Sequence, residues 1–237
     1  MIERGMIFNG EMVRAILDGR KTQTRRPVRF PVLDKNLGCE LAGNELAGEL
    51  SAGNYLNSAF GKPGHRIWVR ETWATLGNED GCCVDWEDNL CKGDERSAAR
   101  IYRASCEQRP GDYGLWSIPD DADWKPHTKD HKFEGAWRPS IHMPRWASRI
   151  LLEITSVRVE RLNAISEEDA RAEGIIDGGC LNCGEPEPCG CANPEPDATD
   201  AFAYLWQSIY GQENWNANPW VWVIEFKSIE GGDHATN

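Results

Sequence analysis

The sequence has no long hydrophobic run. No segment approaches the roughly 18 consecutive apolar residues that a membrane-spanning helix needs. The opening stretch carries acidic side chains and no long apolar core, so it does not resemble a secretory signal. A dinucleotide-binding glycine fingerprint, a P-loop and a regular βαβ alternation are also missing, which argues against the common nucleotide-enzyme folds. We therefore expect a cytoplasmic protein with no membrane partner.

Positive charge is in short supply overall. The chain has 26 Lys and Arg against 38 Asp and Glu, a net charge of −12, which argues against indiscriminate binding to a phosphate backbone. The balance reverses between residues 14 and 29, where only Asp18 is acidic and six residues are basic: Arg14, Arg20, Lys21, Arg25, Arg26 and Arg29. This pattern suits a short anionic ligand better than a long duplex. A basic face that is merely solvated would give the same pattern.

The nine cysteines are an odd number, and without a secretory signal we interpret them as free thiols or metal ligands. Four of them have the spacing C-x2-C-x5-C-x-C: Cys180, Cys183, Cys189 and Cys191. Four thiolates among Gly and Pro can surround a tetrahedral Zn²⁺ and fold a segment too polar to fold alone. We expect structural zinc, because four thiolates leave no open position. The alternatives are a flexible Cys-rich loop or a ligand drawn from Cys82, Cys83 or Cys91.

Hydrophobic periodicity predicts a small set of helices and strands. Residues 11–18 form one apolar helical face that ends before Gly19, and the β-prone segment 21–28 follows. Ser166 and Asp169 form a helix-capping pattern. The other elements that we predict are strands at 66–70, 100–104, 151–162 and 220–226, and helices at 167–175 and 200–210.

The order of these elements predicts the α+β class, with mainly antiparallel strands, short helices and long polar inserts. We expect one domain over residues 1–237, because no segment between the inserts is long enough to form its own core. The inserts are 31–61, 76–97, 107–134 and the Cys-rich segment 178–197, which we interpret as loops.

Several motifs, taken in order, resemble a known family. Gly-Arg-Lys-Thr-x-Thr-x-Arg at 19–26 is similar to the opening of ASCH domains, and GKPGHRIWVRETW, ITSVRVERL, SEEDARAEGI and NPWVWVIEFK follow in the expected order. Together they look like the larger ASCH proteins of phages and prophages. The resemblance implies a PUA-like β-barrel with a cleft, in a superfamily associated with RNA, modified bases and nucleosides. One ASCH branch removes the acetyl group from N(4)-acetylcytidine, and its catalytic residues correspond to Lys21, Thr24 and Glu173.

These three residue types can in principle hydrolyse an amide. A Thr hydroxyl becomes a nucleophile when a neighbouring base takes its proton, and a neutral Lys is such a base if its pKa is lowered. Glu173 would then carry a proton to the departing amine. Residues three apart on a strand face opposite sides, so Lys21 and Thr24 converge only if Lys21 lies in the turn before the strand. A solvated turn is the ordinary role of such a Lys-Thr pair.

Other residues are candidates for holding the ligand. Basic or aromatic side chains near the motifs could contact phosphate or stack on a base: Arg20, Arg25, Arg26, Arg70, Trp137, Arg138 and His142. The alternatives are that Trp137 and Trp146 are core residues, that His142 is structural, and that Arg70 pairs with Glu71 or Glu225.

The sequence therefore favours a protein that binds a nucleoside or a single-stranded nucleic acid in a PUA-like cleft and hydrolyses an N-acyl pyrimidine nucleoside there. Two alternatives stay open. One is a binding module for RNA, DNA or a modified base with no catalytic activity. The other is a phage protein that binds a host protein through its acidic surface.

Overall fold

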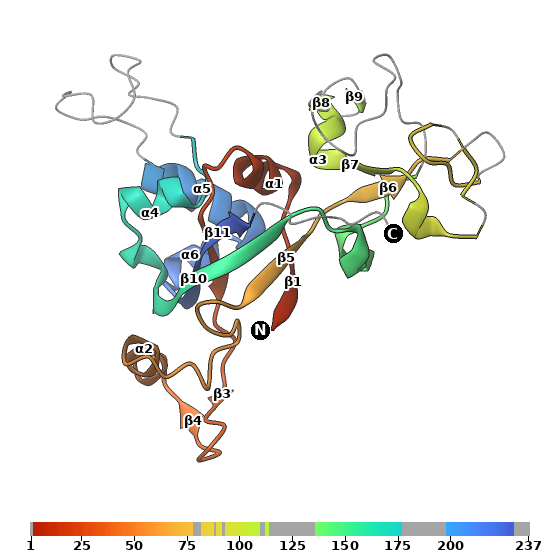
Figure 1. The fold of residues 1–237 in the computed structure, drawn as a ribbon. Coiled ribbons are helices and arrows are strands. Elements are labelled where there is room, and N and C mark those ends of the chain that lie inside the picture. The colour runs from red at the N-terminus through yellow and green to blue at the C-terminus, as the bar shows by residue number, and fades with distance from the viewer. Residues whose placement is uncertain are drawn as a thin grey trace, which may run out of the picture. The chain divides into compact units, whose positions relative to one another are not determined.

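A computed structural model of the chain describes residues 2–77, 82–87, 89–91, 93–109, 112–113, 136–176 and 198–229 (Figure 1). The chain divides into two compact units. The first unit contains Ala15–Arg66 and Leu152–Ile229, with the start of the chain up to Glu3. The second unit contains Arg4–Arg14 and Ile67–Leu151.

The fold is α+β, as predicted, with one five-stranded mixed sheet. The strand order is β1 (Glu3–Ile7), β5 (Arg66–Arg70), β10 (Leu151–Arg161), β11 (Trp220–Ile229) and β2 (Gln23–Pro27). Strands β2 and β11 are antiparallel, with Thr24 opposite Ile224 and Arg26 opposite Trp222. Arg66 N donates to Ile2 O where both strands begin, and Phe8 N donates to Arg70 O where both end, so β1 and β5 are parallel.

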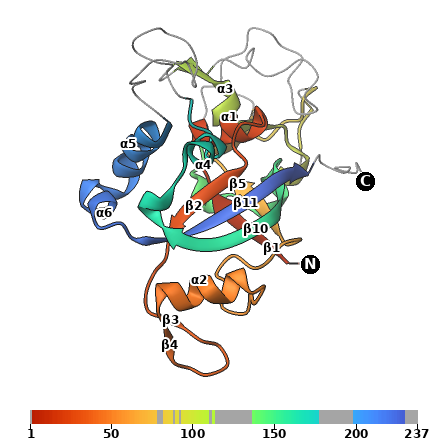
Figure 2. The same cartoon turned by 90° about the vertical axis from the view of Figure 1, so that its left-hand side faces the viewer.

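The predicted strands of the first unit are confirmed. Strand β10 alternates inward residues such as Leu152 and Ile154 with partly exposed ones, which is the period that its sequence shows. Residues Val221–Ile224 of β11 are all buried, because this strand lies inside the sheet between β10 and β2 (Figure 2). Strand β2 is an edge strand that ends at Pro27, and Val28 N still donates to Trp220 O of β11 at 2.9 Å.

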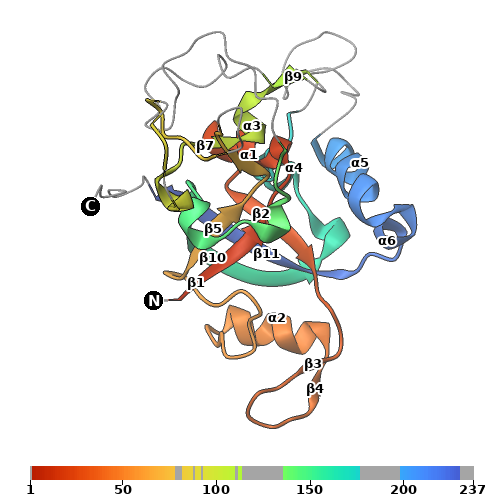
Figure 3. The ribbon, with the colours of Figure 1, turned by 90° about the vertical axis from the view of Figure 1, so that its right-hand side faces the viewer.

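Three helices pack with these strands. They are α4 (Glu167–Ala172), α5 (Ala198–Tyr210) and α6 (Gln212–Asn216), seen with β2 in Figure 3. Their apolar side chains share one cluster with β11: Leu162, Ala170, Ala198, Phe202, Trp206, Val221 and Val223. The Glu167 carboxylate accepts hydrogen bonds from Ala198 N and Thr199 N at 2.9 and 3.0 Å, so α4 also fixes the start of α5. The short turn η5 (Leu162–Ala164) connects β10 toward α4.

The segment 31–61 is not the plain loop that we predicted. It contains the short strands β3 (Val32–Leu33) and β4 (Glu40–Leu41) and the helix α2 (Gly43–Ser51). Glu45 accepts a hydrogen bond from Ala42 N at 2.8 Å, which satisfies a free donor at the helix start. Leu46 and Leu50 are buried one helical turn apart. The apolar residues were too few to show a helical period in the sequence.

The second unit holds most of α1 (Gly10–Leu17) and the pair β6 (Trp73–Thr75) and β7 (Arg100–Tyr102). After β7 come α3 (Arg103–Cys106) and the pair β8 (Glu107–Arg109) and β9 (Asp112–Tyr113). The unit also contains 3-10 turns at η1 (Glu95–Ser97), before β7, and at η3 (Ser140–His142) and η4 (Arg145–Ala147). The predicted strand 100–104 is therefore shorter than expected. None of the described helices is long and apolar enough to cross a membrane.

Candidate functional site

Lys21 lies in the short connection between α1 and β2. Gly19 adopts a positive φ of 74°, which ends the helix and turns the chain. Lys21 N then donates to Ala15 O at 2.9 Å, and Lys21 forms an isolated antiparallel bridge with Glu173. The turn therefore fixes the lysine backbone directly beside a residue 152 positions further along the chain.

Glu173 lies at the other side of that bridge, at the end of α4. Ser166 begins this helix as predicted, because its hydroxyl accepts from Asp169 N at 3.1 Å. Glu173 N closes the last turn on Asp169 O and Ala170 O. Thr22 N donates to Ala172 O at 2.9 Å, which ties the end of α4 to the segment before β2.

The side chains of Lys21 and Glu173 meet in a buried ion pair. Lys21 Nζ donates to Glu173 Oε2 and to Glu173 O, both at 2.8 Å, and the exposed fractions of the two side chains are 0% and 4%. Burial lowers the pKa of Lys21 below its ordinary 10.5, although the contact with Glu173 acts in the opposite direction. The lysine is thus easier to deprotonate than one in water.

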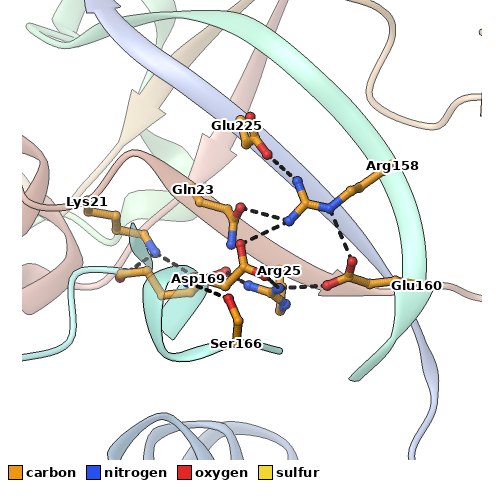
Figure 4. A network of polar contacts seen from close by, with 9 residues as sticks. Lys21, Gln23, Arg25, Arg158, Glu160, Ser166, Asp169 and Glu225 are labelled. Atoms are coloured by element: carbon orange, nitrogen blue, oxygen red, sulfur yellow. Dashed lines mark hydrogen bonds and ion pairs between the residues drawn. The ribbon is translucent and has the colours of Figure 1, made fainter. Parts of the chain in front are cut away.

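A network of ion pairs surrounds this contact (Figure 4). Arg25 donates to Glu173 Oε1 at 3.2 Å, Glu160 Oε1 at 2.6 Å and Asp169 Oδ2 at 3.0 Å. The network also contains residues from β2, β10, α4 and β11: Gln23, Arg158, Glu160, Asp169 and Glu225. The Glu173 carboxylate therefore has a cation on each oxygen, and its orientation is fixed.

Thr24 is buried, with 1% of its surface exposed, but its hydroxyl forms no hydrogen bond with Lys21 or Glu173. Its Oγ1 has no hydrogen-bond partner among the described residues. Gln23 and Arg25 face the network, and strand alternation places Thr24 on the opposite face of β2. The structure thus brings Lys21 and Glu173 together and does not join Thr24 Oγ1 to either of them.

The predicted basic ligands of the first unit have different environments. Arg20 is partly exposed, donates to Gly174 O at 2.9 Å and pairs with Asp18. Arg25 forms ion pairs with three carboxylates and is 2% exposed. Arg26 is half-buried and lines a cavity of about 560 Å³ at the end of β2.

The remaining predicted ligands belong to the second unit. Trp137 is half-buried against the cluster of Ala74, Ile101 and Cys106, in line with the alternative that it is a core residue. Arg138 pairs with Glu95 and lies 4.9 Å from the ring centre of Trp73. His142 is exposed at the end of η3.

Arg70 does not pair with either of the two acids considered in the sequence. Its Nε donates to Ser140 O at 3.2 Å, and its guanidinium lies 5.5 Å from the ring centre of Trp68. Glu71 is instead held by Arg149 through two bonds of 2.9 Å, and Glu225 by Arg158. The alternative in which Arg70 pairs with Glu71 or Glu225 is therefore not what the structure shows.

The four cysteines expected to hold zinc, Cys180, Cys183, Cys189 and Cys191, lie outside the described residues. Within the described ranges, no three His, Cys, Asp or Glu side chains are grouped so that they could hold a metal ion. Zinc binding by the four cysteines stays a prediction.

The sequence reasoning missed most of the network. Arg158 and Glu160 stand two apart in β10, so alternation places them on the same face. That signal was present in SVRVER, but nothing in the sequence indicated that this face would meet Arg25 and Asp169. Comparisons with protein-family models, curated proteins and solved structures found no match for this chain.

Proposed function

We propose that the first unit has a PUA-like fold of the ASCH type and that its Lys21–Glu173 pair hydrolyses the amide of an N-acyl pyrimidine nucleoside. The observation that carries this proposal is the buried contact of 2.8 Å between Lys21 Nζ and Glu173 Oε2. The family resemblance implies a catalytic role for both residues, although 152 positions of the chain separate them. A chance motif match gives no reason for two such distant residues to touch.

The pair can supply both a base and an acid. The lowered pKa of Lys21 favours its neutral amine, which can act as the base. Because Thr24 lies on the opposite face of β2, this step requires a movement that brings Oγ1 to Lys21 Nζ. The amine then takes the proton of the Thr24 hydroxyl as Oγ1 bonds to the acyl carbon. The carbon–nitrogen bond breaks while Glu173 passes the proton from Lys21 Nζ to the leaving amine, and water then hydrolyses the ester, releasing the acid and free Thr24.

A binding module without catalytic activity is the second candidate. Two observations favour it: Thr24 Oγ1 is not hydrogen-bonded to Lys21, and Lys21, Thr24 and Glu173 are each less than 5% exposed. In this account the ion pairs only hold β2, β10, β11 and α4 together. The bound molecule, an RNA, a DNA or a modified base, would then contact other residues of the first unit.

Turnover separates the two functions. Purified full-length protein is incubated with N(4)-acetylcytidine, and cytidine is measured by chromatography. We expect cytidine to form, and we expect Lys21→Ala and Thr24→Ala to abolish its formation while circular dichroism shows that the variants stay folded. If the protein leaves N(4)-acetylcytidine and related acylated nucleosides intact but binds short RNA or DNA in fluorescence titrations, the binding module is the correct account.

A further inference from the structure

A second candidate site lies at the end of β2 that is distant from Lys21. The cavity of about 560 Å³ is formed by β2, the segment that follows it, β11 and the helices α5 and α6. Lys21 precedes β2, whereas Arg26 is near its end, and none of the residues that line the cavity belongs to the ion-pair network around Lys21 and Glu173. The cavity is therefore distinct from the Lys21–Glu173 pair, although both lie in the first unit.

The charge of the cavity is opposite to that of the chain. Two arginines line it, Arg26 and Arg29, and none of its lining residues is acidic, although the chain as a whole carries a net charge of −12. Asp34 and Glu49 accept hydrogen bonds from Nδ2 of the lining residue Asn57 at 3.1 and 2.8 Å, and neither carboxylate lines the cavity. Two guanidiniums in a hollow without acids favour an anion with several oxygens, such as a phosphate.

Arg29 is well placed for a ligand because its side chain is exposed and has no ion pair or hydrogen bond with the described part of the chain. Asn214 adds a neutral donor. Its Oδ1 accepts from Trp206 Nε1 at 2.9 Å, which fixes the amide and leaves Nδ2 for another acceptor. The polar groups of the cavity are thus mainly donors.

Aromatic rings provide the rest of the cavity wall. Phe60 and Trp222 pack edge to face with their centres 5.8 Å apart, and the ring centre of Tyr210 lies 4.4 Å from that of Trp206. These contacts hold the rings in place before a ligand arrives, which reduces the entropy lost on binding. Rings of this kind stack on nucleic-acid bases without strong base preference.

We propose that this cavity binds one nucleotide: its phosphate monoester contacts Arg26 and Arg29, and its base lies against Phe60, Trp222 and Tyr210. The volume supports a single nucleotide, because sites for small molecules typically measure about 300–1,000 Å³. The nucleotide is either free or the phosphate-bearing end of a strand. This inference does not depend on amide hydrolysis, because the ligand carries no acyl group.

Calorimetric titration of the full-length protein tests the proposal with four probes: cytidine monophosphate, cytidine, inorganic phosphate and a short single-stranded oligonucleotide with or without a terminal phosphate. We expect cytidine monophosphate to bind at least tenfold more tightly than cytidine or phosphate alone, with an affinity that falls as salt increases. A phosphorylated oligonucleotide that binds as well as the free nucleotide would identify a strand end as the ligand, and weaker binding would identify the free nucleotide.

Variants locate the site. Arg29→Gln, at an exposed position where misfolding is not expected, should weaken binding of cytidine monophosphate at least tenfold and leave cytidine binding unchanged. Lys62→Gln is the matched control, because it removes one positive charge from an exposed residue outside the cavity, and its affinity should stay within twofold of the wild type. Equal affinity for nucleotide and nucleoside, or equal losses in the two variants, would overturn the proposal.

Discussion

A buried hydroxyl without a hydrogen-bond partner destabilises a folded protein by about 1–3 kcal/mol. Thr24 Oγ1 is such a group among the described residues. Natural proteins keep unfavourable groups of this kind mainly where function requires them. The proposed role of Thr24 as the nucleophile gives a reason for its presence on a strand where Val would fit equally well.

We therefore predict that Thr24→Val makes the protein more stable and inactive. Val has the shape of Thr and removes the unpaired oxygen, so the free energy of unfolding should rise by about 1 kcal/mol. Urea denaturation measures the first effect, and turnover of N(4)-acetylcytidine measures the second. A Thr24→Val protein that is less stable than the wild type would show that the hydroxyl has a partner in solution.

Gly174 packs closely against Lys21 and Ala15. Its φ is +89°, and a Cβ at this position would lie 2.8 Å from Ala15 Cβ and 3.0 Å from Lys21 Cβ. Gly53 has a similar φ of +80°, but a Cβ there would meet nothing within 4 Å. The two glycines therefore separate the effect of backbone conformation from the effect of close packing against Lys21.

We predict that Gly53→Ala lowers the free energy of unfolding by about 1–2 kcal/mol, the cost of a left-handed residue. Gly174→Ala should lower it by a further 1–3 kcal/mol or so, because the new methyl group overlaps Ala15 and Lys21. It should also reduce turnover, since Lys21 has to move. Equal destabilisation in the two variants, measured by denaturant unfolding, would mean that Lys21 is not tightly packed on Gly174.

At the level of elements, the ion pairs join β2, β10, β11 and the capped helix α4. Asp169 lies between Arg25 and Arg158, 3.0 Å from each. Burial by itself would raise the pKa of Asp169, but the two guanidiniums and its hydrogen bonds outweigh burial and hold the pKa below its ordinary value of 3.8. Because the folded state binds this proton less tightly than the unfolded state, Asp169 stabilises the fold above that ordinary value.

This stabilisation should disappear as the pH falls from about 4 through the lower pKa of the folded state. We predict that the urea midpoint of the wild type falls over that range, and that it falls less steeply in Asp169→Asn, which cannot titrate there. Parallel curves for the two proteins would show that the contacts of Asp169 with Arg25 and Arg158 do not contribute to stability.

The Cys-rich segment is an element that the sequence alone predicts. If Cys180, Cys183, Cys189 and Cys191 hold zinc, the purified protein should contain about one zinc per chain by elemental analysis. Cys183→Ser should lower this content and Cys39→Ser, which changes an exposed cysteine elsewhere, should not. Equal zinc content in both variants, or no zinc in the wild type, would contradict the prediction.

Elements with a regular pattern could be predicted from the sequence, and elements fixed by distant contacts could not. Strand β10 and the capped helix α4 show their period or cap locally, so their limits were close to those observed. Helix α2 was missed because Leu46 and Leu50 are its only large buried side chains, which is too few to show a helical period in the sequence. Glu173 became a candidate site residue only through the family resemblance, because nothing local in the sequence links it to Lys21, 152 residues away.

At the scale of the whole molecule, the charge distribution limits what the protein can bind. The net charge of −12 repels polyanions, yet the cavity at the end of β2 is lined by arginines and no acid. We therefore expect the protein to prefer small anionic ligands over long duplexes. This is consistent with the proposed binding of a nucleoside derivative or a single nucleotide.

The most direct test of the central claim compares two Lys–Glu pairs of the first unit in the turnover of N(4)-acetylcytidine. Glu173 pairs with Lys21 at 2.8 Å in a buried site, and Glu153 pairs with Lys227 at 3.1 Å on the surface. If the buried pair moves protons in catalysis, Glu173→Gln should lower turnover by about 100-fold or more, whereas Glu153→Gln should not change it. A folded Glu173→Gln protein with wild-type turnover would contradict the claim.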